Sequence, residues 1–251
     1  SCHCIIGGGG LLQGVFTDFW QALVASNLDF SLLGVGLNRM PGRSGLKTEL
    51  LQSIFAQATI LGLRDPMTVA LVAPEHRDKV RLHTCPAHNF IRAQSHKGNT
   101  VVQPVLLHML HEADLRLANV DIAALKEHVQ MLATTHGLTY VEATNMNNNF
   151  TTAIAQVATS QVVVTSRLHG CIMSYATGRP CIGIACDAKL SQYIHAHTQY
   201  TSVLPDANLH ANISLALDCI TQVPLPQITS EQLHNTHTVA QEILQQVASC
   251  R

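Results

Sequence analysis

The sequence is poor in charged and in aromatic residues. Only 12% of its 251 residues are Asp, Glu, Lys or Arg, only 4% are Phe, Trp or Tyr, and the formal net charge is −1. A chain without a basic excess has no electrostatic means of following a nucleic-acid backbone, so we expect no nucleic-acid partner. Apolar residues make up 47% of the chain, which predicts a folded core rather than disorder. A small or weakly charged ligand suits this composition.

The motifs of several common sites are missing too. Gly7 to Gly10 follows an expected strand, but Leu12 breaks the GxGxxG pattern, and there is no GxxxxGK[ST]. Dinucleotide loops and ATP-type phosphate loops are therefore not supported. Neither HExxH nor CxxC occurs. The fragment Cys2-His3-Cys4 could hold a metal but lacks a second pair of ligands, so we expect no metal site.

The chain also lacks a long apolar run and a signal peptide. We expect no transmembrane segment. Cysteines such as Cys171, Cys181 and Cys186 lie in apolar stretches, where free cysteine behaves as a small hydrophobic residue. This pattern indicates a reducing compartment, and we expect a cytoplasmic protein. The 15 histidines are scattered, with His108 and His111 as one close pair, and for most of them we expect a surface position.

Short runs of β-branched residues alternate with helical patterns along the whole chain. Such alternation predicts an α/β fold with parallel sheets covered on both faces. The polar stretch 91–100 has no pattern and is interpreted as a linker. We therefore expect two Rossmann-like domains facing a cleft, an N-terminal domain at 1–92 and a C-terminal domain at 100–251. The chain begins inside a strand pattern and without Met, so we expect the first domain to be truncated at its N-terminus.

Two arginines stand directly after expected strands. Arg64 follows the strand 59–63 and precedes Asp65-Pro66, a helix N-cap with proline in the first turn. Arg167 follows the strand 162–166 and precedes a helix at 168–177. Helix N-termini favour anions, and the guanidinium fork matches a carboxylate or a phosphate. Each arginine either holds such a ligand or anchors a neighbouring carboxylate.

Three further polar residues lie near the same strand ends. His169 falls on the first turn of the helix after Arg167, where it could exchange a proton near neutral pH or bond to nearby backbone. Asp187 and Lys189 follow the strand 181–185. Lys189 could hold a phosphate and Asp187 a hydroxyl, or the two could be an N-cap and a solvated lysine. In open parallel sheets, ligands bind at the carboxyl ends of the strands.

Taken together, four segments resemble the polysaccharide pyruvyltransferase family. They are the glycine loop "IIGGGGLLQ", the strand and loop "LLGVGLNRMPG", the strand-Arg-Asp-helix element "ILGLRDPMTVALV", and "VVVTSRLHGCIMSYATGRPCIGIACDAKL". The last is the most specific, because it combines Arg-Leu-His, a helix of small residues, Gly-x-Pro, a second strand and Asp-x-Lys. The family usually begins with a further strand, after which this chain starts.

The resemblance implies a glycosyltransferase-B-like fold and a transferase. The reaction implied is transfer of a pyruvyl group from phosphoenolpyruvate to two sugar hydroxyls of a polysaccharide or glycolipid precursor, giving a ketal. The donor is a substrate, and no cofactor, nucleotide or metal is required. The implied acceptor can be lipid-linked, which would place the protein at the inner face of the membrane in envelope polysaccharide assembly.

The resemblance also implies roles for individual residues. These are His169 and Arg167 in catalysis, Arg64, Arg167, Leu168 and Lys189 in donor binding, and Gly8, Gly9, Gly10 and Asp187 in acceptor binding or the loop. Two alternatives stay open. One is a nucleotide-sugar glycosyltransferase on the same architecture, which needs a carboxylate to bind a ribose. The other is a non-catalytic, truncated relative that acts in envelope assembly.

Overall fold

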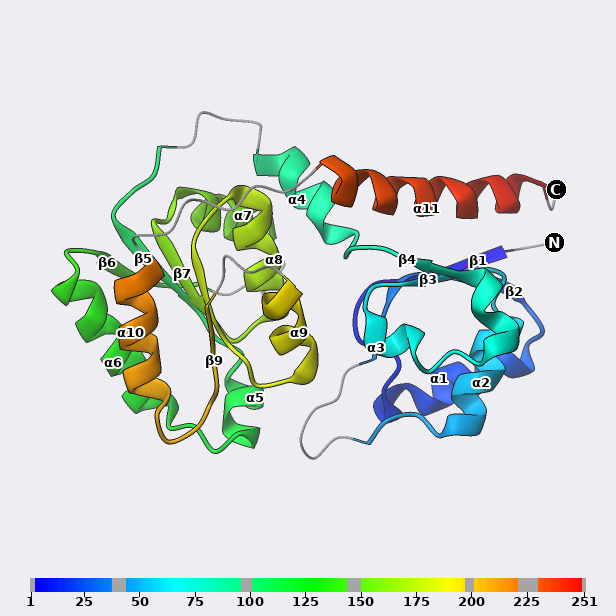
Figure 1. Ribbon diagram of the computed structural model, residues 1–251, viewed down its shortest axis with the longest axis horizontal. Helices are drawn as coiled ribbons and strands as arrows, with labels where there is room; N and C mark the ends of the chain where they lie inside the picture. The colour runs from blue at the N-terminus through cyan, green and yellow to red at the C-terminus, as the bar shows by residue number, and fades with distance from the viewer. Residues whose placement is uncertain are drawn as a thin grey trace. The chain divides into compact units, whose positions relative to one another are not determined.

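A computed structural model describes residues 3–37, 44–95, 101–143, 150–196, 201–220 and 230–249. The chain forms two compact units, each with its own sheet (Figure 1). Unit 1 contains Ser1–Pro86 and Thr229–Arg251, and unit 2 contains Ala87–Ile228. Within the described residues, no helix has both the length and the apolar character needed to cross a bilayer.

Unit 1 is built on a four-stranded sheet with the order β1-β2-β3-β4, and every pairing in it is parallel. The strands are β1 (His3–Gly7), β2 (Asp29–Val35), β3 (Leu61–Leu63) and β4 (Val80–Leu82). The helices are the short 3₁₀ helices η1 (Gly14–Phe16) and η2 (Pro74–Lys79), with α1 (Thr17–Ala25), α2 (Thr48–Gln57), α3 (Pro66–Val69) and α11 (Ser230–Ser249). Parallel neighbours require crossover connections, which α1 and α2 supply.

Apolar side chains cover both faces of this sheet. On one face, Trp20 of α1 and Phe55 of α2 are fully buried in a cluster with the strand residues. On the other, Ile243 of α11 packs in a second cluster with Ile60. Arg81 on β4 also fixes α11, because its guanidinium donates to both carboxylate oxygens of Glu242, with Nη2 2.6 Å from Oε1. Figure 1 shows α11 running along the face opposite α1 and α2.

Unit 2 has a five-stranded parallel sheet with the order β6-β5-β7-β8-β9. Its strands are β5 (Val105–Met109), β6 (Thr139–Glu142), β7 (Val162–Thr165), β8 (Cys181–Ile184) and β9 (Thr201–Val203). Its helices are α4 (Ala87–Ser95), α5 (Glu112–Leu117), α6 (Ile122–Thr135), α7 (Phe150–Thr159), α8 (Leu168–Thr177), α9 (Ala188–Ala196) and α10 (Leu209–Ile220). From β5 the chain passes to β6, which pairs with one edge of β5, and then to β7, which pairs with the opposite edge of β5. The strand order therefore reverses at β5 and β7, and this switch point is where doubly wound sheets bind ligands.

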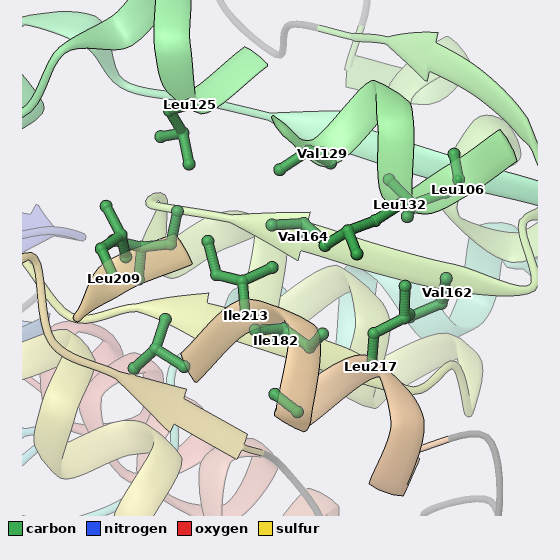
Figure 2. Packing of buried hydrophobic residues seen from close by; sticks show 14 of the residues in the cluster. Leu106, Leu125, Val129, Leu132, Val162, Val164, Ile182, Leu209, Ile213 and Leu217 are labelled. Atoms are coloured by element: carbon green, nitrogen blue, oxygen red, sulfur yellow. The ribbon is translucent and has the colours of Figure 1, made fainter. Parts of the chain in front are cut away.

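A hydrophobic core cluster of unit 2 lies between its sheet and the helices α6 and α10 (Figure 2). Val129 of α6 and Ile213 of α10 meet Val164 of β7 and Ile182 of β8, and all four are fully buried. At roughly 1.5–3 kcal/mol for each fully buried aliphatic side chain, this cluster is a main source of stability for the unit. It holds β5 and β7, whose ends carry the candidate site, in fixed register.

The expected fold class is confirmed, because both units are α/β with parallel sheets. Two expectations about the chain differ from the structure. The stretch interpreted as a linker is helical as far as Ser95, in α4, because Ile91 is fully buried and gives the helix an apolar anchor. Residues 96–100 of that stretch, and Cys2 of the metal fragment, lie outside the described residues. The segment 230–249 belongs to unit 1 rather than to the domain expected at 100–251, because the sheet of unit 1 receives its apolar face.

Candidate active site

The turn after β5 is held firmly against the end of β7. Thr165 donates from Oγ1 to the carbonyl of Met109 at 2.7 Å, and the Ser166 amide donates to the same carbonyl at 3.2 Å. In return, the His111 amide donates to Ser166 Oγ at 2.7 Å. Close approach of α8 to β7 depends on Gly170, where an added Cβ would lie 2.4 Å from Thr165 Oγ1. The carboxyl ends of the two switch-point strands are thus joined by side-chain bonds.

Arg167 is the N-cap residue of α8 and lies at this junction. Its Nε donates to the Leu110 carbonyl at 2.8 Å, and its amide donates to Thr165 Oγ1 at 3.0 Å. Burial lowers the pKa of the guanidinium, while the negative charge of Asp114 raises it. Within the described part of the chain, neither terminal Nη atom of Arg167 donates a hydrogen bond. The guanidinium is therefore oriented through Nε and keeps its fork for an anion.

Arg167 lines a pocket of about 330 Å³ at the carboxyl ends of β5, β6 and β7. Five other polar residues line it, namely His108, His111, Glu112, Lys126 and Glu142. Nδ1 of His111 lies 2.7 Å from Asp114 Oδ2, but the geometry is not that of a hydrogen bond. A polar pocket at a topological switch point is the usual position for a ligand site in such sheets.

The inner wall of the pocket is assembled by strand register. His108 lies opposite Glu142 in the pairing of β5 with β6, and Tyr140 shares the face of Glu142 because side chains alternate along a strand. The Tyr140 hydroxyl lies 2.8 Å from His108 Nδ1 and donates to Glu142 Oε1 at 3.1 Å. Sequence reasoning missed His108, which is only 1% exposed and is an exception to the surface position expected for most histidines. The spacing Tyr140-x-Glu142 is a weak signal that could have indicated this face.

His169 and Leu168 occupy the first turn of α8, as expected. His169 is exposed and Leu168 is half-buried. Neither lines the pocket that contains Arg167. The helix itself is well defined, because Gly178 ends it in the left-handed conformation with a φ of 68°. The structure thus places His169 two residues after Arg167 and on the surface of unit 2.

Arg64 lies at the carboxyl end of β3 in unit 1. Its side chain is 6% exposed, its Nε lies 4.0 Å from Asp65 Oδ2, and its Nη2 is buried without a hydrogen-bond partner in the described residues. Asp65 caps α3 by accepting from the amide and the hydroxyl of Thr68. A buried donor without a partner costs roughly 1–3 kcal/mol, which a bound anion could offset. Arg64 is therefore a second place in the chain where an anion is expected.

The glycine loop lies beside Arg64 in unit 1. Gly8 and Gly9 have φ values of 77° and 80°, which L side chains rarely adopt. The Gly9 carbonyl accepts from the Gly36 amide at 3.1 Å, and an added Cβ on Gly36 would meet Arg64 Nε at 2.7 Å. The Gly10 carbonyl accepts from Gln13 Nε2 at 2.7 Å. The loop and Arg64 thus share the carboxyl edge of the unit 1 sheet.

Asp187 and Lys189 lie at the carboxyl end of β8. Asp187 caps α9, since its Oδ1 accepts from the Leu190 amide at 2.7 Å. Its Oδ2 lies 3.4 Å from Lys189 Nζ. Both residues thus have structural partners here, and neither lines the pocket with Arg167. In the described ranges, no group of three His, Cys, Asp or Glu residues is placed to hold a metal ion.

Comparison with known proteins agrees with the fold and identifies the family. A crystal structure of Methanocaldococcus jannaschii UDP-GlcNAc 2-epimerase in complex with UDP-GlcNAc and UDP matches with a TM-score of 0.65 and 11% sequence identity, over 95% of this chain and 74% of that chain. At this identity the match shows the glycosyltransferase-B-like fold alone. No curated protein matches the sequence significantly.

The sequence model described as "Polysaccharide pyruvyl transferase" matches residues 1–188, a range that includes both arginines and most of the segments from which the resemblance was drawn. The matched range covers well over half of the chain. The chain therefore belongs to the polysaccharide pyruvyl transferase family and is a transferase.

Proposed function

We propose that the protein transfers a pyruvyl group from phosphoenolpyruvate to two hydroxyls of a sugar, forming a ketal on a polysaccharide or glycolipid precursor. The observation that carries this proposal is Arg167, whose guanidinium is oriented by the Leu110 carbonyl at the wall of a switch-point pocket. Phosphoenolpyruvate carries a phosphate and a carboxylate, and both match a guanidinium fork. We expect the reaction on the cytoplasmic side of the membrane and without a cofactor.

Two arginines are assigned to anion binding in this proposal. Arg167 binds one anionic group through its terminal nitrogens, beside the N-terminus of α8, whose backbone dipole favours negative charge. Arg64, in unit 1, is also assigned to anion binding, through Nη2, which is buried and without a partner in the described residues. Leu168 packs beside the donor, and Lys189 adds a positive charge at the end of β8.

The chemistry balances with the donor and a diol alone. A proton adds to the methylene carbon of phosphoenolpyruvate, which becomes a methyl group and leaves C2 electrophilic. One sugar hydroxyl then bonds to C2 and loses its proton. The C2–O bond to phosphate breaks, and the second hydroxyl bonds to C2 and loses its proton. One hydroxyl proton replaces the proton consumed at the methylene carbon, and the other leaves with inorganic phosphate.

We assign the acid and base role to His169, which lies exposed on the first turn of α8, two residues after Arg167. A histidine can donate a proton to the methylene carbon and accept one from a hydroxyl near neutral pH. Arg167 stabilises the developing charge on the leaving phosphate. Gly8, Gly9, Gly10 and Asp187 remain assigned to acceptor binding or to the loop, and they do not line the pocket with Arg167.

Calorimetric titration with phosphoenolpyruvate tests the donor assignment. We expect the parent to bind, and Arg167→Ala to bind roughly 10- to 100-fold more weakly, because a hydrogen bond to a charged group contributes about 1.5–3 kcal/mol. Arg64→Lys keeps the charge but removes the fork, and we expect a similar loss. Arg77→Ala is the control, since Arg77 is an exposed arginine in unit 1. Binding of UDP-GlcNAc but not of phosphoenolpyruvate would contradict the proposal in favour of a nucleotide-sugar enzyme, and binding of neither by folded protein would favour a non-catalytic relative.

A further inference from the structure

The pocket beside Arg167 contains a chain of charged groups that the donor does not need. Lys126 of α6 lies between two carboxylates, with Nζ 3.2 Å from Glu112 Oε1 and 2.9 Å from Glu142 Oε2. The hydrogen bond from Lys126 is the main reason why the pKa of Glu142 is lowered. Glu142 is therefore ionised at neutral pH, and its carboxylate balances the positive charge of Lys126.

The deeper end of the pocket contains a neutral histidine. Tyr140 donates its hydroxyl proton to Glu142, so its oxygen accepts from Nδ1–H of His108, which leaves His108 Nε2 as an acceptor. Nε2 is buried and has no hydrogen-bond partner in the described residues. An unsatisfied acceptor in a buried wall is unfavourable and becomes favourable when a ligand donates to it. Hydroxyl groups are donors of this kind.

The pocket therefore presents acceptors, which pair with a ligand that donates hydrogen bonds and not with an anion. Two carboxylates and the His108 ring accept hydrogen bonds from a ligand. A second anion or a nucleotide diphosphate would be repelled by the negative charges of Glu112 and Glu142. The volume of about 330 Å³ corresponds to about ten water molecules in the liquid, which is enough for one sugar ring but not for several. The partly exposed glutamates leave the ring open to solvent on one side, where a saccharide chain can continue.

We propose that the pocket formed by His108, Glu112, Lys126, Glu142 and Arg167 binds the hydroxyl groups of an uncharged sugar ring, the acceptor of the pyruvyl group. The proposal rests on the proposed function for the identity of the reaction, but the sugar-binding site stands on the pocket alone. Arg167 is shared between the donor and this pocket, which brings the hydroxyls next to the donor carbon that they attack. Close placement of two reactants is a large part of what such a site supplies to catalysis.

Saturation-transfer NMR tests this site with three probes, the methyl glycosides of galactose, glucose and mannose, each added in turn to the full chain. We expect at least one glycoside to bind. Glu142→Gln and Glu112→Gln keep the shape of the side chains and remove the charges, and we expect each to weaken binding at least threefold and the double variant at least tenfold. Glu127→Gln is the matched control, because Glu127 lies on α6 next to Lys126 but is exposed and does not line the pocket. Both pocket glutamates are more than 40% exposed, so folding of the variants is expected and is checked by thermal unfolding.

The results separate this proposal from the donor assignment. If the parent binds phosphoenolpyruvate but none of the three glycosides, the sugar site is wrong and the donor assignment stands. If a glycoside binds equally well to the parent and to the folded double variant, the sugar site is also wrong. If a glycoside binds in a manner that depends on the glutamates while phosphoenolpyruvate does not bind, the sugar site stands and the donor assignment fails.

Discussion

Unit 2 is expected to lose stability in mild acid because His108 cannot accept a proton where it lies. Burial lowers the pKa of His108 from 6.5 to about 4, while the charge of Glu142 raises it and that of Lys126 lowers it. Between these two values the unfolded chain binds a proton that the folded protein does not, so stability falls as the pH falls. The difference between the pKa of 6.5 in the unfolded chain and about 4 in the folded protein corresponds to about 3 kcal/mol in the free energy of unfolding. About 2 kcal/mol of this is lost by pH 5.

The variant His108→Gln isolates this contribution, because glutamine is polar and does not titrate. We expect the parent to lose about 2 kcal/mol more than the variant between pH 7.5 and pH 5, a difference of about 1 M in the urea midpoint. Pulsed hydrogen exchange of the peptides that contain β5 and β7 reports on unit 2. The fluorescence of Trp20, the single tryptophan, reports on unit 1 and serves as an internal reference. An equal loss in parent and variant would refute the reasoning.

Two further substitutions test the contacts that shape the units. Gly170→Ala forces a Cβ against Thr165. We expect thermal unfolding to show that the free energy of unfolding falls by about 1–3 kcal/mol, and we expect weaker phosphoenolpyruvate binding. Gly45→Ala is the control, because an added Cβ there meets nothing within 4 Å, and it should leave both quantities unchanged. Arg81→Ala breaks the partly exposed pair with Glu242, and we expect a loss of about 0.5–1 kcal/mol in the free energy of unfolding and faster hydrogen exchange in α11. Recovery in the swapped pair Arg81→Glu with Glu242→Arg would confirm the contact. Unchanged hydrogen exchange of α11 in Arg81→Ala would contradict it.

The sequence predicts the alternation of strands and helices well, because each element carries its own pattern. The prediction that Asp65 caps a helix with Pro66 in its first turn is confirmed by the bond from the Thr68 amide. The helix 168–177 matches α8 at both ends, since Gly178 stops it. Local chemistry decides these features, so one sequence is enough to find them.

The remaining features depend on contacts between distant segments. The apolar face of α11 is visible in the sequence, but nothing in the pattern says that Ile243 packs against the first sheet. The candidate pocket could not be predicted from the pattern either, because His108 and Tyr140 are 32 residues apart and are brought together only by the register of β5 with β6. The sequence motifs predicted Arg167, which lies at the end of a strand, but they did not predict Glu112 and Glu142, which line the same pocket.

The most direct test of the account is to follow the donor carbon through the reaction. Phosphoenolpyruvate labelled with ¹³C at C2 is mixed with the protein and with the glycoside that binds most tightly, and ¹³C and ³¹P NMR are recorded over time. The account predicts a new ketal carbon and an equal amount of inorganic phosphate, with neither product formed by Arg167→Ala. Persistence of phosphoenolpyruvate with the parent protein, or its conversion to free pyruvate without a ketal, would contradict it.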